Sequence, residues 1–235
     1  MVLKIKDIFT ILTIVCGFMV LVFSSVSDFF IASLFIIIGW MFDMFDGFYC
    51  RLTKTANEFG AEFDRIADLI IYSMAPGVLA FFAYKQYNIH LAAFIGAIPL
   101  VFGSIRLARF NIKRAEYPGY WFGLPRPASA IAIVSFLNSG MFLKLEFKEA
   151  GLIFILIVCA MNLSTAPYIG HHNRKFSKTQ KGLMVLAIIA FILSAYFKKG
   201  WDYIAVLSII YIASPLFLPE KKKSELRKFL ANINK

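Results

Sequence analysis

The sequence is poor in cysteine, with only Cys16, Cys50 and Cys159 among 235 residues, and none of the three lies near another along the chain. A disulfide framework needs an even set of cysteines, and a structural zinc site needs closely spaced cysteine or histidine ligands. All three lie in or next to apolar runs. The cysteines therefore predict neither a disulfide framework nor a zinc site.

The chain also lacks a soluble basic domain, although it carries a net charge of +11 from 25 lysines and arginines against 14 acidic residues. Binding to nucleic acid would require such a domain to present the positive charge. We therefore expect no nucleic-acid partner. The charge is better explained by membrane topology and by contact with lipid headgroups.

Long polar stretches are scarce, and the composition is 60% hydrophobic and 17% aromatic, with 26 phenylalanines and a mean hydropathy of +0.72. These values are too apolar for a soluble domain of this length. We expect an all-α, polytopic membrane protein that forms a single integral domain, residues 1–235. Eight apolar stretches could span the bilayer: 8–23, 29–49, 63–84, 89–110, 122–143, 150–169, 182–197 and 201–218.

The placement of the basic residues predicts the orientation. With the N-terminus inside and eight spans, 20 of the 25 lysines and arginines fall on cytoplasmic segments or helix ends. This bias predicts that both termini are cytoplasmic. We expect a multi-pass protein of the cell membrane, with its site opening to the cytoplasmic side. The run 220–235 is typical of a short basic amphipathic helix on the membrane surface.

Four aspartates lie within these apolar spans: Asp43, Asp46, Asp64 and Asp68. A carboxylate in a membrane helix costs about 3 kcal/mol on insertion scales, so the four together cost on the order of 12 kcal/mol. Residues three or four apart share a helix face, so each pair converges. Four carboxylates around one cavity suit divalent cations, which prefer oxygen ligands and cancel the charge.

Paired carboxylates inside a membrane also occur in proteins without this chemistry. Ion-coupled transporters carry them, but a transporter built from repeats would show a second copy of the cluster, and the chain has none. An ion-pair network with Arg51 and Arg65 would give Gly47 and Gly60 no purpose. In a catalytic site these glycines let the backbone approach a nucleotide.

The acids have a fixed set of companions: Asp43-x2-Asp46-Gly47-x2-Cys50-Arg51-x8-Gly60-x3-Asp64-x3-Asp68. This pattern resembles the signature of the CDP-alcohol phosphotransferase family, with Cys50 where alanine is usual. The runs RLARFN, 106–111, and WFGLPRPASA, 121–130, are similar to those of family members that use serine. The first helix, 7–18, is also similar, although the usual Pro-Asn before it is absent.

The resemblance implies transfer of a phosphatidyl-type group from a CDP-lipid to an alcohol, with release of CMP. Asp43, Asp46, Asp64 and Asp68 would hold two Mg²⁺ or Mn²⁺ ions, and Asp68 would also be the catalytic base. Gly47, Arg51 and Gly60 would line the CDP pocket, and Thr10 would add a polar contact. The family core would cover about 1–170, followed by two further helices and a basic tail, 171–235. A homodimer is expected from the family.

L-serine is the expected acceptor. Its carboxylate needs a guanidinium near the metals, for which Arg106, Arg109 and Arg126 are candidates, with Asn111 as a further one. Arg106 is favoured because it lies further into its span. The alternatives are the same chemistry with glycerol 3-phosphate or an inositol phosphate, which would need a larger basic cluster, and a cation-coupled transporter.

Overall fold

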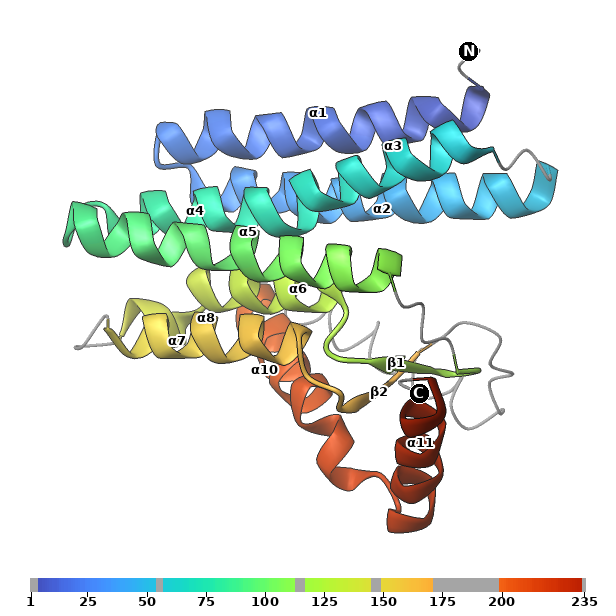
Figure 1. Cartoon of the computed structure of the whole chain (residues 1–235). Coiled ribbons are helices and arrows are strands. Elements are labelled where there is room, and N and C mark those ends of the chain that lie inside the picture. The colour runs from blue at the N-terminus through green and yellow to red at the C-terminus, as the bar shows by residue number, and fades with distance from the viewer. Residues whose placement is uncertain (1–3, 54–56, 113–116, 145–148, 171–198, 234–235) are drawn as a thin grey trace.

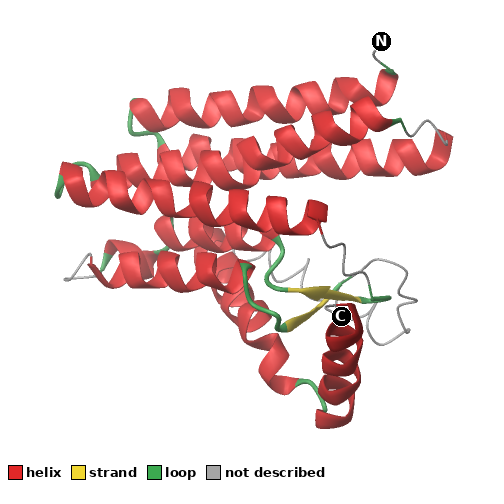
Figure 2. Ribbon diagram, viewed as in Figure 1, coloured by secondary structure: helices red, strands yellow, loops and turns green. Residues whose placement is uncertain are grey.

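The computed structural model describes residues 4–53, 57–112, 117–144, 149–170 and 199–233. Helices dominate these ranges (Figures 1 and 2). Five helical segments are long and apolar enough to cross a bilayer: Lys6–Ser25, Phe29–Thr53, Glu58–Tyr84, Ile89–Ile112 and Gly200–Phe217. The prediction of a polytopic helical membrane protein is confirmed.

The first two spans form an antiparallel pair. Helix α1, Ile5–Ser25, ends at a turn in which Ser27 adopts a positive φ of 63°. Helix α2, Phe29–Thr53, then begins with the Asp28 carboxylate accepting a 3.1 Å hydrogen bond from the Ile31 amide. This carboxylate satisfies an amide that has no partner within the helix. The two helices pack closely against each other.

The third span changes its helical geometry near the middle. Helix α3, Glu58–Leu69, continues into a π-helical turn, η1, Ile70–Met74, and then into α4, Ala75–Tyr84. Pro76 lacks an amide hydrogen, and its ring would collide with the carbonyl four residues earlier in a regular α-helix. The wider turn, in which the Ala75 amide bonds the Ile70 carbonyl, accommodates this proline. The turn begins two residues after Asp68.

Helix α5, Ile89–Ile112, packs closely against α4. Gly77 and Gly96 make this possible, because a Cβ on Gly77 would meet the Gly96 carbonyl oxygen. Apolar side chains at the centre of the bundle, including Ile71, Leu79 and Ile95, are fully buried. Large apolar residues on the outer faces are exposed, as expected for helices that contact lipid.

The structure corrects the bounds of the fifth and sixth predicted spans, 122–143 and 150–169. The apolar run 120–122 forms strand β1, Tyr120–Phe122, and Pro167–Ile169 forms β2, which pairs with it antiparallel. Between them lie α6, Arg126–Leu137, α7, Gly140–Leu143, and α8, Glu149–Asn162. Gly123, with φ of 77°, and Pro125 separate β1 from α6. Neither α6 nor α8 reaches the length that a full span needs.

The predicted seventh span, 182–197, lies outside the described residues. The eighth is present as α10, Gly200–Ala213, followed by the 3-10 turn η2, Ser214–Phe217. The predicted C-terminal helix is α11, Glu220–Ile233. Its apolar side chains contact β1 and the residues before it, forming a small cluster: Phe122, Leu218, Leu226, Tyr117, Tyr120, Phe229 and Leu230.

The polar end of this cluster is formed by Tyr117, Lys222 and Glu225. The Tyr117 hydroxyl donates to Glu225, and the Lys222 ammonium donates to both of the others. Hydrogen bonds from Tyr117 and Lys222 lower the pKa of Glu225. In Figure 1 the start of α1, the end of α2, the start of α3, the β-strands and α11 lie toward the same end of the molecule.

Candidate active site

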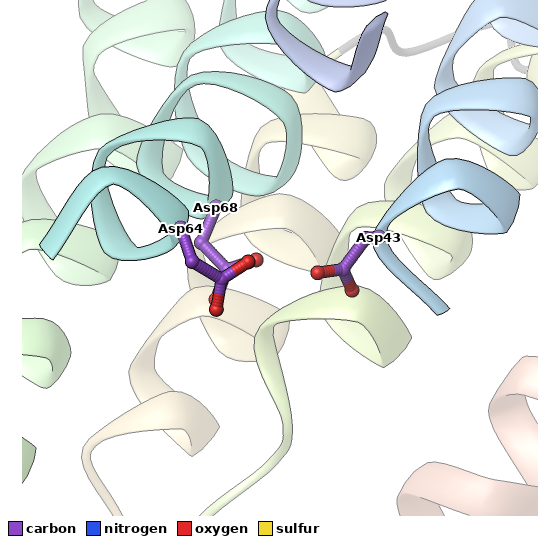
Figure 3. A group of neighbouring side chains, drawn as sticks. All are labelled: Asp43, Asp64 and Asp68. Atoms are coloured by element: carbon purple, nitrogen blue, oxygen red, sulfur yellow. The ribbon is translucent and has the colours of Figure 1, made fainter. Parts of the chain in front are cut away.

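Three aspartate carboxylates meet between α2 and α3. Asp43 comes from α2, and Asp64 and Asp68 come from successive turns of α3 (Figure 3). One oxygen from each carboxylate lies within 4.8 Å of those of the other two. The i, i+4 spacing of Asp64 and Asp68 places both on the α3 face that is turned toward Asp43. The sequence predicted that these three carboxylates converge, in a group of four that also included Asp46.

Asp46, the fourth predicted ligand, lies one turn further along α2 and is 4% exposed. Its carboxylate accepts a hydrogen bond from the Thr10 hydroxyl of α1. It does not belong to the group of three that share the 4.8 Å separation. The structure thus brings Asp43, Asp64 and Asp68 together and holds Asp46 beside them against α1.

Two side chains from other segments contact the three carboxylates. The Tyr72 hydroxyl, in the π-helical turn, donates a 2.6 Å hydrogen bond to Asp43. The Nη2 atom of Arg126, at the start of α6, forms a 2.7 Å ion pair with Asp68. The Nη1 atom of Arg126 is buried and has no hydrogen-bond partner among the described residues. Arg126 therefore has a free donor close to the carboxylates.

The glycines of the signature lie where side chains come close to the backbone. A Cβ added to Gly47 would lie 3.2 Å from the Nη1 atom of Arg51. The exposed Arg51 side chain therefore folds back over this glycine. At Gly60, a Cβ would meet the Lys6 ammonium from α1. The Gly60 amide donates a 3.0 Å hydrogen bond to the Asn57 side chain, which caps α3. Both glycines are positions of close approach.

The other predicted acceptor residues contact a different part of the chain. Arg106 donates a 2.7 Å hydrogen bond to the Asn162 carbonyl. Arg109 donates to the Leu163 carbonyl at 2.6 Å and to that of Ser164 at 3.3 Å. Asn111 is exposed near the end of α5. Of the four candidates, Arg126 contacts the carboxylates directly, whereas Arg106 binds the last carbonyl of α8 and Arg109 binds the backbone just after it.

Sequence reasoning missed three residues in this region: Tyr72, Lys6 and Asp7. Tyr72 lies four residues beyond Asp68 and eight beyond Asp64, and this spacing could have placed it on the same face. Lys6 and Asp7 are adjacent charges at the start of an apolar helix, and charges inside a membrane segment point to function. Tyr72 contacts Asp43 from η1, Lys6 lies beside Gly60 from α1, and Asp7 holds Lys6 through an ion pair.

The donor set suits a hard divalent cation. Three carboxylates supply only oxygen ligands, which Mg²⁺ and Mn²⁺ prefer over nitrogen or sulfur. Like charges at this separation repel one another strongly in a partly buried site. Bound cations would offset that repulsion, whereas the single guanidinium of Arg126 offsets only part of it.

The comparisons with known proteins agree with this geometry. The family model described as CDP-alcohol phosphatidyltransferase matches residues 3–166. The chain belongs to the CDP-alcohol phosphatidyltransferase family. The match covers the four aspartates, both signature glycines and Arg126, while α10 and α11 lie beyond it.

Individual members of the family are also similar to this chain. A CDP-diacylglycerol--serine O-phosphatidyltransferase of Helicobacter pylori is 31% identical over 88% of this chain and 86% of its own length. A protein of the same name from Methanocaldococcus jannaschii is 34% identical over 57% of this chain and 61% of its own length. An archaetidylserine synthase of Methanothermobacter thermautotrophicus is 25% identical over 71% of this chain and 70% of its own length.

Proposed function

We propose that this protein transfers a phosphatidyl-type group from a CDP-lipid to the hydroxyl of L-serine and releases CMP. The observation that carries the proposal is the meeting of Asp43, Asp64 and Asp68 from two segments that are long and apolar enough to span a membrane. Carboxylates inside a membrane segment need a function that offsets their cost. The names of the similar proteins from H. pylori and M. jannaschii support serine as the acceptor.

We assign the binding of two divalent ions to Asp43, Asp64 and Asp68 together with Asp46. When bound, such ions stabilise the negative charge that develops on the phosphoryl oxygens and on the leaving CMP phosphate. Thr10 orients Asp46 through its hydroxyl, and Tyr72 orients Asp43. These hydrogen bonds fix the carboxylates from outside the group, as ligands of a metal site require.

The CDP group is assigned to the surface formed by Gly47, Arg51 and Gly60, with Thr10 nearby. The lack of side chains at the two glycines lets Arg51 and Lys6 approach the backbone, and a nucleotide phosphate can be bound there by these cations. The exposed guanidinium of Arg51 can move from Gly47 to a phosphate, which it can bind through two parallel hydrogen bonds.

We assign two tasks in the acceptor half of the site. Asp68 takes the proton of the serine hydroxyl as that oxygen attacks phosphorus. Arg126 holds Asp68 through its Nη2, which leaves its buried Nη1 free to bind the serine carboxylate. Arg106, Arg109 and Asn111 remain further candidates for acceptor binding.

We infer that the site opens to the cytoplasmic side of the cell membrane, where CMP and serine are soluble. The support is the bias of lysine and arginine, 20 of 25, toward the segments assigned to that side. We also expect membrane lipids as partners and a homodimer as the working form, on the family resemblance.

The proposal is tested by measuring CMP release from CDP-diacylglycerol with purified protein and a panel of acceptors. Serine should support release, while glycerol 3-phosphate and inositol phosphate should not. Release with glycerol 3-phosphate in place of serine would keep the chemistry and overturn the acceptor. If no alcohol supported CMP release, the transferase proposal would be rejected, and the alternative of a cation-coupled transporter would have to be tested.

A further inference from the structure

Lys6 and Asp7 form a buried ion pair at the start of α1. The Lys6 ammonium lies 2.8 Å from an oxygen of Asp7, and the two residues are 3% and 0% exposed. Removing two charges from water costs several kcal/mol each, so burial of such a pair contributes little net stability. Because the pair adds little net stability, a role in ligand binding would explain why it is present.

The Lys6 ammonium is aimed at α3. It occupies the space beside Gly60 that a Cβ would fill, next to the Asn57 side chain that caps this helix. The start of a helix carries partial positive charge, which favours anions. The ammonium adds a full positive charge at the same place, and it also interacts electrostatically with Asp46.

Asp7 fixes the direction of the ammonium. Its second carboxylate oxygen accepts a 2.7 Å hydrogen bond from the Lys4 amide, so the carboxylate is tied to the start of α1. An ammonium has three N–H donors. Among the described side chains, only Asp7 accepts a hydrogen bond from the Lys6 ammonium. Lys6 therefore retains donors for a further acceptor near Gly60.

We propose that Lys6 binds a phosphate of the CDP group and that Asp7 positions its ammonium for that purpose. This inference rests on the proposed function, which assigns Gly60 to the CDP pocket. A diphosphate carries negative charge that the aspartates alone would repel, and a preorganised ammonium offsets it. Lys6 is then a phosphate-binding residue, and its contribution falls on nucleotides rather than on the nucleoside.

The experiment measures binding of CDP and of cytidine to the detergent-solubilised protein by calorimetry in Mg²⁺. Lys6→Met should weaken CDP binding about 10- to 100-fold, the range expected for loss of a charge-assisted hydrogen bond, and leave cytidine binding unchanged. Lys6→Arg keeps the charge and should retain most of the affinity. Lys85→Met is the matched control, because this exposed lysine follows α4 at the opposite end of the bundle.

A double variant separates binding from folding. Lys6→Met alone leaves Asp7 buried without its partner, which destabilises the fold, whereas Lys6→Met with Asp7→Asn removes both charges. The double variant should melt near the wild-type temperature, and its affinity for CDP should remain weaker than that of the wild type. Wild-type affinity for CDP in the double variant would overturn the proposal, as would an equal loss of CDP and cytidine affinity in Lys6→Met.

The proposed function can fail separately from this inference. If the wild-type protein released no CMP with serine but bound CDP in a Lys6-dependent way, the acceptor chemistry would be wrong and the phosphate contact would stand. If CMP release were normal and CDP affinity were unaffected by Lys6→Met, the contact would be wrong and the reaction would stand.

Discussion

Asp43 joins α2 to the site, since the other two carboxylates of the group come from α3. Asp43→Asn keeps the size of the side chain and its hydrogen bond with Tyr72 but removes a charged ligand. We expect activity to fall by more than about 100-fold, because even the hydrogen-bond partners of metal ligands contribute about 10- to 100-fold. Steady-state CMP release across a Mg²⁺ titration measures the effect.

The matched control is Asp28→Asn, at the turn between α1 and α2, where an asparagine oxygen can still accept from the Ile31 amide. This control should be fully active. A near-normal rate and metal requirement in Asp43→Asn would show that Asp43 is not a metal ligand.

Asp68 has two assigned roles, base and ligand, that one substitution separates. If it mainly accepts the serine proton, Asp68→Asn should slow the reaction about 10²- to 10⁴-fold while CDP-lipid still binds. The measurements are the single-turnover rate and the CDP-lipid affinity at increasing Mg²⁺. If the rate and the CDP-lipid affinity recovered in parallel at high Mg²⁺, Asp68 would be a metal ligand and the base role would be excluded.

Spacing along a helix predicted which aspartates share a face, but not which side chains meet them from other helices. Asp64 and Asp68 converge because a helical repeat requires it. The partners Tyr72 and Arg126 depend on how η1 and α6 pack against α2 and α3, which no local pattern encodes. Lys6 was missed for the same reason, since its neighbour Gly60 lies on another helix.

The contact between α4 and α5 depends on two glycines. Gly77→Val would drive a side chain into the Gly96 carbonyl and separate the helices. Overpacking of this kind costs about 1–3 kcal/mol, so the thermal unfolding midpoint in detergent should fall. Ala97→Val, on an exposed face of α5, is the control and should melt like the wild type. Equal midpoints for both variants would show that this contact adapts without cost.

Helix α11 is attached through a small apolar cluster, in which Leu226 is 1% exposed. Leu226→Ala should weaken the attachment, since truncation of a buried leucine costs about 2–5 kcal/mol. Limited digestion with trypsin should then cut faster at the lysines and arginine of α11. Ser224→Ala, on the exposed side of the same helix, should leave the rate unchanged. No acceleration in Leu226→Ala would contradict the docked position.

The fifth and sixth predicted spans show a limit of hydropathy. Apolar residues at 120–122 and 167–169 look like the ends of membrane helices, but they pair as β1 and β2. A short apolar run fits the end of a buried helix or a strand equally well. Gly123, with positive φ, and Pro125 were the local signals that a helix could not run through this region.

At the scale of the whole molecule, composition was sufficient to predict the class. A chain that is 60% hydrophobic has to bury its helices in lipid, and five described segments meet the length for a span. The carboxylates lie beside the buried apolar core of the bundle, which surrounds a charged group with packed helices. This combination of charge and apolar frame is what the proposed reaction requires.

The most direct test is serine-dependent CMP release by the wild-type protein in CDP-diacylglycerol micelles, with and without a chelator. The account predicts release that stops in chelator, returns with Mg²⁺ or Mn²⁺, and is lost in Asp64→Asn although that variant remains folded. Asp28→Asn should behave like the wild type throughout. Full turnover in chelator, or normal release by Asp64→Asn, would contradict a metal-dependent reaction at the three-aspartate group.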